Sequence, residues 1–518
     1  MVHMSSQLLR TKSIDKLVAE AEEPTHRLRK SLGPWSLTAL GIGAIIGTGI
    51  FVLTGTAAAG EVLQVQSIWK APLLDLVLHG SHAVGLAGRP GAGPGIALSF
   101  LMVALVCALA GLCYAELASM IPIAGSAYTY TYATLGELIA WIIGWDLILE
   151  YAVSNMAVAV GFSAYIDSLL QGFGIHLPRE FMEPMFVSGA RTGSYFNVPG
   201  FLVVMIITVI LILGIRESAG ANSFMVTVKI IAILVFVFAA SRYVEVANWK
   251  PFLPNGWQGV LTGGAIVFFT YIGFDSVSTA AEECQRPQRD VPFGIIASLV
   301  ICALLYVSVA VVLTGIQHWQ ALRNAAPVAN ALQAIGLPSV QRWVTLGALT
   351  GMLSSLLVFQ LGQARVWFAM SRDGLLPRAF TRVHPRFRTP HVSTLAAGLF
   401  VAIPAGIFDI GTLADLSNIG TLFAFLLVSL GVLVLRRRQP ARPRAFRTPW
   451  VPVIPILSII CCLVLMASLP LETWARFLVW LAVGLTIYFS YSKRHSEFGS
   501  DSHALEPESG PSRNQQTS

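Results

Sequence analysis

Glycines at positions 41, 43, 47 and 49 fall inside one apolar run and can interrupt a helix there. Each glycine costs a helix about 1 kcal/mol relative to alanine. The end of an interrupted helix leaves N–H groups free to bind an anion, or carbonyl groups free to bind a cation. The alternative is that the glycines only let a neighbouring helix pack closely.

A second candidate interruption lies in Phe268–Asp275, where Gly273 falls near the middle of another apolar run. Two interrupted helices at corresponding places in two halves of a chain indicate an inverted-repeat transporter with a binding site between them. Main-chain donors and acceptors lying a few ångströms apart suit a ligand that carries a carboxylate and an ammonium. Because both interruptions fall at corresponding places in the two halves, a binding site is favoured over close packing alone.

The composition indicates that these segments lie in transmembrane helices. The chain has 518 residues, of which 55% are hydrophobic and only 12% charged, and its mean hydropathy is +0.69. Soluble domains carry about 25% charged residues. We therefore predict an all-α integral membrane protein rather than a soluble one.

Apolar runs long enough to cross a bilayer predict twelve transmembrane helices. They lie at residues 36–58, 95–119, 137–170, 199–215, 221–241, 258–281, 293–316, 339–371, 391–408, 412–435, 452–470 and 472–492. We predict a tail at 1–35, a first five-helix repeat at 36–241 and a second at 258–435. Two peripheral helices at 452–492 and a disordered tail at 493–518 complete the chain.

Lysine and arginine predict the orientation, because cytoplasmic loops carry most of them. With both termini cytoplasmic, twenty-three of the 34 lie inside, nine outside, and Lys229 and Arg365 within the membrane. The net charge of +7 is then explained by the topology and by contact with anionic lipid headgroups. We therefore expect no nucleic acid partner. The outer loop at 61–94 can hold a short surface helix over 72–78. The expected location is the cell (inner) membrane.

Four motifs in order resemble the amino acid–polyamine–organocation superfamily, in its cationic amino acid transporter branch. They are Gly41–Phe51, Tyr114–Tyr130, Gly273–Glu283 and Phe368–Pro377. The resemblance implies a leucine-transporter-type fold, with a 5+5 inverted repeat and alternating access. It also implies that the amides of Gly47, Thr48 and Gly49 hold a substrate carboxylate, and that the carbonyls of Ile45, Phe269 and Ile272 hold its ammonium.

Ionisable residues inside the membrane are costly and are therefore functional candidates. Lys229 falls about 12 Å into its span, where a proton that leaves and returns can couple transport to a proton gradient. In sodium-coupled relatives this span helps form a cation site, so the ammonium can replace that ion; a permanently paired structural lysine is the alternative. Glu150 and Asp146 can pair with Lys229, carry a second proton, or only fix their helix. Asp275 can complete the ammonium site or pin the unwound segment.

Two residues on the eighth span, Phe359 and Gln360, fall at mid-depth and are expected to limit the space for the substrate side chain. Small neutral amino acids are at least as consistent with the sequence as cationic ones, because no unpaired acidic residue is assigned to a cationic side chain. Glu282, Glu283 and Arg372 cluster at inner loop ends and can pair to close the inward path, or can be solvated loop charges. Arg365, near the inner end of its span, is interpreted as structural.

These features predict a secondary carrier of small neutral or cationic amino acids, working by proton symport or exchange. The alternative is a non-transporting amino acid sensor with the same fold. No metal spacing, cofactor motif or catalytic constellation is found, so we expect no enzyme and no cofactor, with a proton gradient as the driving force. The expected partners are the free amino acid and the bilayer, with room for a small accessory membrane subunit.

Overall fold

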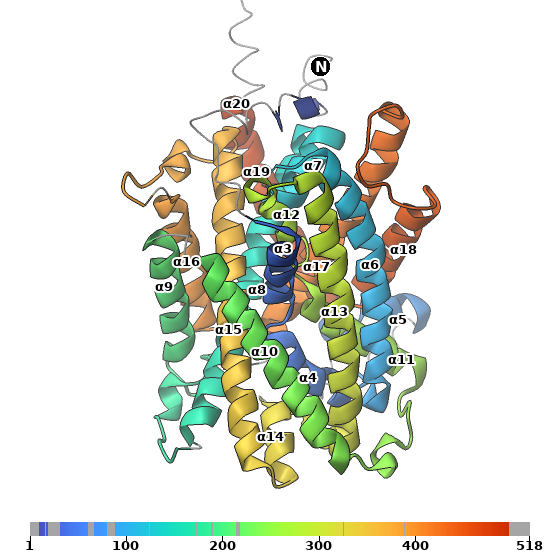
Figure 1. Cartoon of the computed structure of the whole chain (residues 1–518), viewed down its shortest axis with the longest axis vertical. Helices are drawn as coiled ribbons and strands as arrows, with labels where there is room; N and C mark the ends of the chain where they lie inside the picture. Colours follow the sequence, from blue (N-terminus) through green and yellow to red (C-terminus); the bar gives the residue numbers. More distant parts are fainter. Residues whose placement is uncertain are drawn as a thin grey trace, which may run out of the picture.

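The structure, a computed structural model, is a bundle of long helices (Figure 1). It describes residues 10–15, 17–18, 32–60, 67–79, 89–123, 125–171, 173–187, 190–213, 218–324, 326–387 and 389–496. Helix α20 and the first described residues lie at the same end of the bundle, the upper end in Figure 1. We call this end the terminal face.

The helices carry the labels of Figure 1 and cover most of the described chain. Those of the first half are α3 (Pro34–Ile45), α4 (Thr54–Ala59), α5 (Leu73–His79), α6 (Ile96–Met120), α7 (Ser126–Thr134), α8 (Glu137–Gln171), α9 (Val198–Leu213) and α10 (Ser218–Ala240). Those of the second half are α11 (Gly256–Val267), α12 (Ser276–Thr279), α13 (Pro287–Ile316), α14 (Pro327–Ala334), α15 (Pro338–Arg372), α16 (His391–Ala405) and α17 (Ile410–Arg438). The last are α18 (Val453–Ala467), α19 (Leu471–Ile487) and α20 (Lys493–His495).

Twelve spans are confirmed when the broken and short helices are included. Eight helices are long and apolar enough to cross a membrane, and α3 and α4 make a ninth span bent by 41°. The shorter apolar helices α9, α16 and α18 supply the other three. Span boundaries mostly agree with the sequence to within three residues.

The seventh span, α13, differs most from its prediction, since it begins at Pro287 rather than at residue 293. Pro287 occupies the first turn, where proline is favoured because its missing N–H would have no partner anyway. The helix continues through Pro292. Its first turns are polar, so hydropathy alone predicts a later start.

Three short elements lie between spans and were not predicted. They are the buried helix α7, the helix α14, and a two-stranded hairpin, β1 (Phe186–Val187) with β2 (Ala190–Arg191). The expected surface helix of the 61–94 loop is present as α5. Residues 61–66 and 80–88 of that loop, and residues 497–518 of the predicted tail, lie outside the described part of the chain.

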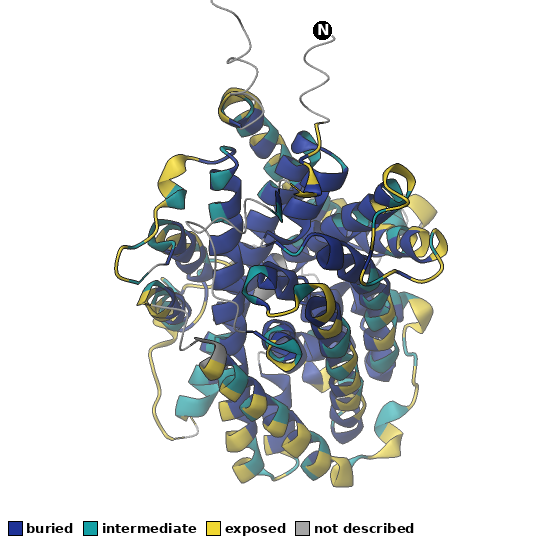
Figure 2. Cartoon of the chain, turned by 45° about the horizontal axis from the view of Figure 1, so that its top comes forward, coloured by how far each residue is buried: buried dark blue, intermediate teal, exposed yellow. Residues whose placement is uncertain are grey.

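Burial separates a central group of helices from a lipid-facing rim (Figure 2). The windows of α8 and of Gly256–Thr279 are almost wholly buried, whereas most of the window of Asn222–Tyr243 is not. Apolar residues such as Phe224, Ile231 and Phe238 stay exposed on α10. An exposed apolar surface of this kind fits contact with lipid, and the most buried of these spans, Gly256–Thr279, is interrupted.

Candidate binding site at two interrupted helices

The first span is interrupted at the glycines that the sequence indicated. Helix α3 ends at Ile45, and Ile46 leaves helical geometry with φ −82° and ψ 88°. A π-helical turn, Gly49–Leu53, then leads into α4. The amide of Gly47 donates to the carbonyl of Ile45 at 3.0 Å, which closes a tight turn at the break.

The sixth span is interrupted at the predicted place. Helix α11 passes into a 3₁₀ turn, Phe268–Tyr271, and Ile272 is extended with ψ 136°. Gly273 has φ +118°, a conformation that side chains with a Cβ rarely adopt. Helix α12 starts only after Asp275.

The two interruptions lie against one another. A Cβ built on Gly273 would be 2.7 Å from the Cβ of Ala44, and one built on Gly49 would be 2.8 Å from the Cα of Thr270. Backbones approach this closely only where side chains are absent. The glycines therefore do both things considered from the sequence: they break the helices and they let the breaks meet.

A tyrosine that the sequence analysis missed connects the two breaks. The hydroxyl of Tyr306 on α13 lies 2.8 Å from the carbonyl oxygen of Ile45 and 2.7 Å from that of Thr270, so it can donate to either. The tyrosine is fully buried in a largely aliphatic helix. An aromatic hydroxyl among aliphatic residues was the available signal.

Lys229 lies beside the first break, on the face of α10 that packs against α3. Its ammonium donates to the carbonyls of Gly43 and Ile46, both at 2.9 Å, and the side chain is fully buried. The Ser355 hydroxyl on α15 donates to the same Gly43 carbonyl at 2.8 Å. The end of α3 is thus held by one cation and one hydroxyl, and Ser355 was not predicted.

Thr48 is anchored into α8 by its side chain. Its hydroxyl donates to the carbonyl of Val158 at 3.3 Å, and a Cβ on Gly161 would be 2.2 Å from its methyl group. This packing orients the start of the second half-helix. The roles of the Gly47, Thr48 and Gly49 amides toward a carboxylate stay predictions.

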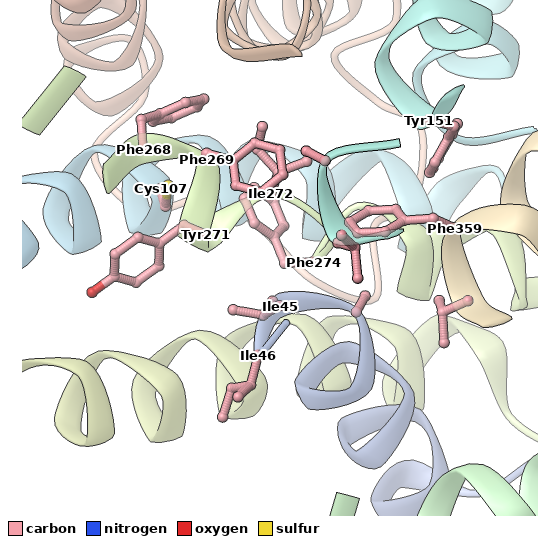
Figure 3. Close-up of a cluster of buried hydrophobic side chains, with 14 of the residues drawn as sticks. Ile45, Ile46, Cys107, Tyr151, Phe268, Phe269, Tyr271, Ile272, Phe274 and Phe359 are labelled. Carbon is pink, nitrogen blue, oxygen red and sulfur yellow. The ribbon is translucent and has the colours of Figure 1, made fainter. Parts of the chain in front are cut away.

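Buried apolar side chains surround the breaks (Figure 3). Phe269, Ile272 and Phe274 come from the sixth span, and Phe359 comes from α15. The ring centroid of Phe359 lies 6.2 Å from that of Tyr151 on α8. This wall consists of aromatic and aliphatic groups, and the prediction that Phe359 limits the space for a substrate side chain stays a prediction.

Gln360 points elsewhere than its neighbour Phe359. Its carbonyl oxygen accepts from the Asn155 amide, and its own amide lies 3.5 Å from Thr208 on α9 and from the Thr394 carbonyl on α16. These partners join α15 to three neighbouring helices. The geometry therefore gives Gln360 a role in helix packing, and its predicted contact with substrate gains no support.

Asp275 joins the sixth span to α8. Its carboxylate accepts from the Tyr151 hydroxyl at 2.7 Å, and the Ser126 hydroxyl is 3.5 Å away. These bonds favour pinning of the unwound segment, while Oδ1 has no hydrogen-bond partner among the described residues. Both roles considered from the sequence stay open.

Glu150 and Asp146 are buried on α8, and their carboxylate oxygens have no hydrogen-bond partner among the described residues. A Cβ built on Gly420 of α17 would lie 2.6 Å from Asp146 Oδ1, so this carboxylate faces α17. The ammonium of Lys229 is bonded to carbonyls of α3 instead. A direct pair between Lys229 and either acid therefore gains no support from the described contacts.

The charged residues on the terminal face pair differently from the expected gate. Glu283 forms an ion pair with Arg365, which also donates to the Thr279 carbonyl at 3.3 Å. Arg372, in contrast, has a buried Nε without a hydrogen-bond partner in the described structure. Glu283 thus pairs with the residue interpreted as structural, and gating by Glu282, Glu283 and Arg372 stays a prediction.

A second ion pair on this face uses the N-terminal segment. The ammonium of Lys12 lies 3.2 Å from Asp373, whose other oxygen accepts from the Tyr128 hydroxyl at 2.6 Å. The amide of Lys12 donates to the Tyr132 carbonyl, and Ile14 is buried nearby in sequence. This segment therefore packs over α7 and the end of α15.

Twelve spans, two of them interrupted where they meet, define a membrane transporter with a central binding site. The chain belongs to the amino acid permease family, whose model matches residues 32–488. It is 47% identical to the branched-chain amino acid permease BcaP of Bacillus subtilis over 95% of this chain and 99% of that protein. It is 43% identical to the methylthioribose transporter of the same organism, over 95% of this chain and 99% of that protein.

More distant relatives include the vacuolar cationic amino acid transporter 4 of Arabidopsis thaliana, 36% identical over 84% of this chain and 68% of that protein. The family membership confirms the resemblance, the leucine-transporter-type fold with twelve spans, the function of amino acid transport and the absence of an enzymatic role. It also places the protein in a membrane as an integral component.

Proposed function

We propose that this protein moves small, neutral, aliphatic amino acids across the cell membrane by alternating access, coupled to protons. The observation that carries the proposal is the contact between two interrupted helices inside a wall of apolar side chains, Phe269, Ile272, Phe274 and Phe359. Similarity to a branched-chain amino acid permease supports the choice of substrate.

In the proposed complex the substrate's charged groups meet the main chain. The amides at the start of the second half-helix, Gly47 to Gly49, receive the carboxylate, because helix N-termini attract anions. For Gly47 this requires that its amide leave the Ile45 carbonyl, to which it donates at 3.0 Å. The carbonyls of Ile45, Phe269 and Ile272 receive the ammonium. Because the Tyr306 hydroxyl can donate to either of two carbonyls, it can leave Ile45 for Thr270 when a substrate ammonium arrives.

Lys229 provides the proposed proton coupling. While charged, it satisfies the carbonyls of Gly43 and Ile46 at the end of α3. Loss of its proton would weaken both bonds, because hydrogen bonds from charged groups are about twice as strong as neutral ones. The half-helix α3 would then be freer to move. In this proposal, α3 holds its position and closes the substrate path only while Lys229 carries its proton.

The proposed orientation places the terminal face in the cytoplasm. Three arginines end α17, and Lys493 and Arg494 lie in α20 on this face, as expected if it is cytoplasmic. Phosphatidylglycerol-containing bacterial membranes would then contact this basic side. A small accessory membrane subunit remains part of the proposal as a partner to be sought by co-purification.

Uptake by purified protein in liposomes tests the function. Labelled leucine or isoleucine should accumulate when the outside is acidic, and unlabelled lysine should compete weakly. Binding without accumulation would instead identify an amino acid sensor. Methylthioribose, the substrate in the name of a 43% identical relative, lacks both charged groups. Competition by methylthioribose, with none by leucine, would contradict the proposed zwitterion site.

A further inference from the structure

A cavity of about 420 Å³ opens on the terminal face between three separate parts of the chain. Pro34 contributes from the first turn of α3, and Phe446 contributes from the segment between α17 and α18. The other lining residues are Arg286, directly before α13, and five residues of its first turns: Arg289, Asp290, Pro292, Phe293 and Ile296. None of these residues belongs to the site at the interrupted helices.

The lining has one charged side and one apolar side. Arg286 and Arg289 are exposed, and no ion pair involving either is found in the described structure. Two guanidinium groups within one helical turn can bind a phosphate with paired hydrogen bonds. Asp290 lines the cavity too, but it is almost fully buried and its Oδ2 lies 3.8 Å from the Cys284 Sγ. The accessible charge is therefore positive.

The apolar side indicates that the ligand is amphiphilic. Phe293, Ile296 and Phe446 face the same cavity as the arginines. A free phosphate would gain nothing from these groups, whereas glycerol and the first methylenes of an acyl chain would bury apolar area against them.

The depth of the cavity matches the boundary between headgroups and hydrocarbon. Trp35, next to Pro34, is 69% exposed and packs edge-on against Phe293, with ring centroids 5.4 Å apart. Exposed tryptophans of membrane proteins concentrate at this boundary. The arginines precede Phe293 by one to two helical turns, which places them at the level of lipid phosphates.

We propose that this cavity binds the headgroup of an anionic phospholipid, such as phosphatidylglycerol. Basic cavities between transmembrane helices are suited to such headgroups. The bound lipid would connect Pro34, the first residue of α3, with α13. Since α3 carries the interruption at its other end, the lipid would stabilise α3 in the position that it has in this structure, packed against α13. Binding of the lipid does not depend on the proposed transport activity.

Lipid binding by the full-length protein provides the test. Protein in phosphatidylcholine nanodiscs is titrated with phosphatidylglycerol, and binding is followed by native mass spectrometry and by the midpoint of thermal unfolding. The variant R286Q/R289Q should lose about tenfold in affinity, since each basic residue contributes measurably to anionic-lipid binding. The matched control R378Q/R382Q removes two exposed arginines that do not line the cavity, and it should bind like the wild type.

A third variant separates the lipid from other anions. Ile296→Trp fills the apolar side and keeps both arginines, so it should also bind phosphatidylglycerol more weakly. Inorganic phosphate should not raise the unfolding midpoint of the wild type. Equal binding by wild type and R286Q/R289Q would overturn the proposal, and so would a phosphate effect as large as that of the lipid.

Discussion

The ammonium of Lys229 lies 2.9 Å from the carbonyl oxygen of Ile46, the residue at which the first span leaves its helix. Together with the Ser355 hydroxyl, this one charged group satisfies the main-chain carbonyls at the break, which have no helical partner in the membrane. The charge state of Lys229 and the position of α3 are therefore linked by direct contact.

Replacing Lys229 with alanine should separate substrate binding from proton coupling. We expect the Lys229→Ala variant to exchange internal for external leucine but to lose accumulation driven by a pH gradient, at least tenfold. Counterflow and gradient-driven uptake in liposomes measure the two activities. Lys250→Ala, which removes an exposed lysine, is the control. Unchanged accumulation in Lys229→Ala would remove this residue from coupling.

Gly273→Ala should abolish uptake by pushing the two breaks apart. The new Cβ would lie 2.7 Å from Ala44 and would be strained at φ +118°, which by itself costs about 1–3 kcal/mol. Gly336→Ala is the matched control, because φ is +78° there and no atom lies within 4 Å. Uptake in both variants is compared at equal amounts of folded protein. Similar losses in the two would mean that strain, not contact with α3, is responsible.

Tyr306→Phe should weaken substrate binding while leaving the aromatic packing intact. The change removes the hydroxyl that reaches both Ile45 and Thr270, and a buried carbonyl left unpaired costs about 1–3 kcal/mol. We expect a higher KM for leucine. Tyr271→Phe removes a neighbouring hydroxyl that bonds to Phe100 instead, so its KM should change little. A matching rise in both variants would argue against a specific role for Tyr306.

Phe359→Ser should enlarge the space for the substrate side chain. We expect larger amino acids to compete with leucine uptake several-fold better, because the ring at this position lies in the apolar wall beside Tyr151. Competition by a series of amino acids of increasing size measures the change. Phe238→Ser, on the exposed side of α10, should leave the order of competition unaltered, whereas an unaltered order in Phe359→Ser would place this residue outside the site.

Asp373→Asn should release the N-terminal segment from the terminal face. It removes the charge that holds Lys12 at 3.2 Å in a buried pair, and breaking a buried ion pair costs about 3–5 kcal/mol. Limited proteolysis should cut the segment before residue 18 faster than in the wild type. The control is Asp167→Asn, which also removes one carboxylate but lies in the last turns of α8, at the end away from the terminal face. Equal cleavage rates would show that the pair does not hold the segment.

Much of the fold was predictable because its signals are local. Hydropathy indicates a span wherever some twenty apolar residues follow one another, and eleven of the twelve spans begin close to their predicted positions. The start of α13 was missed because its first turns are polar and lie before Pro292. Helix α7 was missed because it is a short buried helix between two spans and lacks the length of a transmembrane run.

Side-chain partners were less predictable. Glu282, Glu283 and Arg372 were predicted either to pair as a gate or to be solvated loop charges, whereas the structure pairs Glu283 with Arg365, two turns before Arg372. Gln360 and Phe359 are neighbours in sequence, yet successive residues on a helix point in different directions. Such choices depend on how each helix is rotated, which composition and spacing do not fix.

Hydropathy and glycine content act within one segment, so the membrane class, the twelve spans and the two positions where helices break could be predicted from the order of residues alone. Three contacts became visible only in the folded chain: Gly273 meets Ala44, Tyr306 joins the two breaks, and Lys229 bonds to α3 rather than to an acid. These contacts connect residues far apart in the chain, and the packing of whole helices sets them.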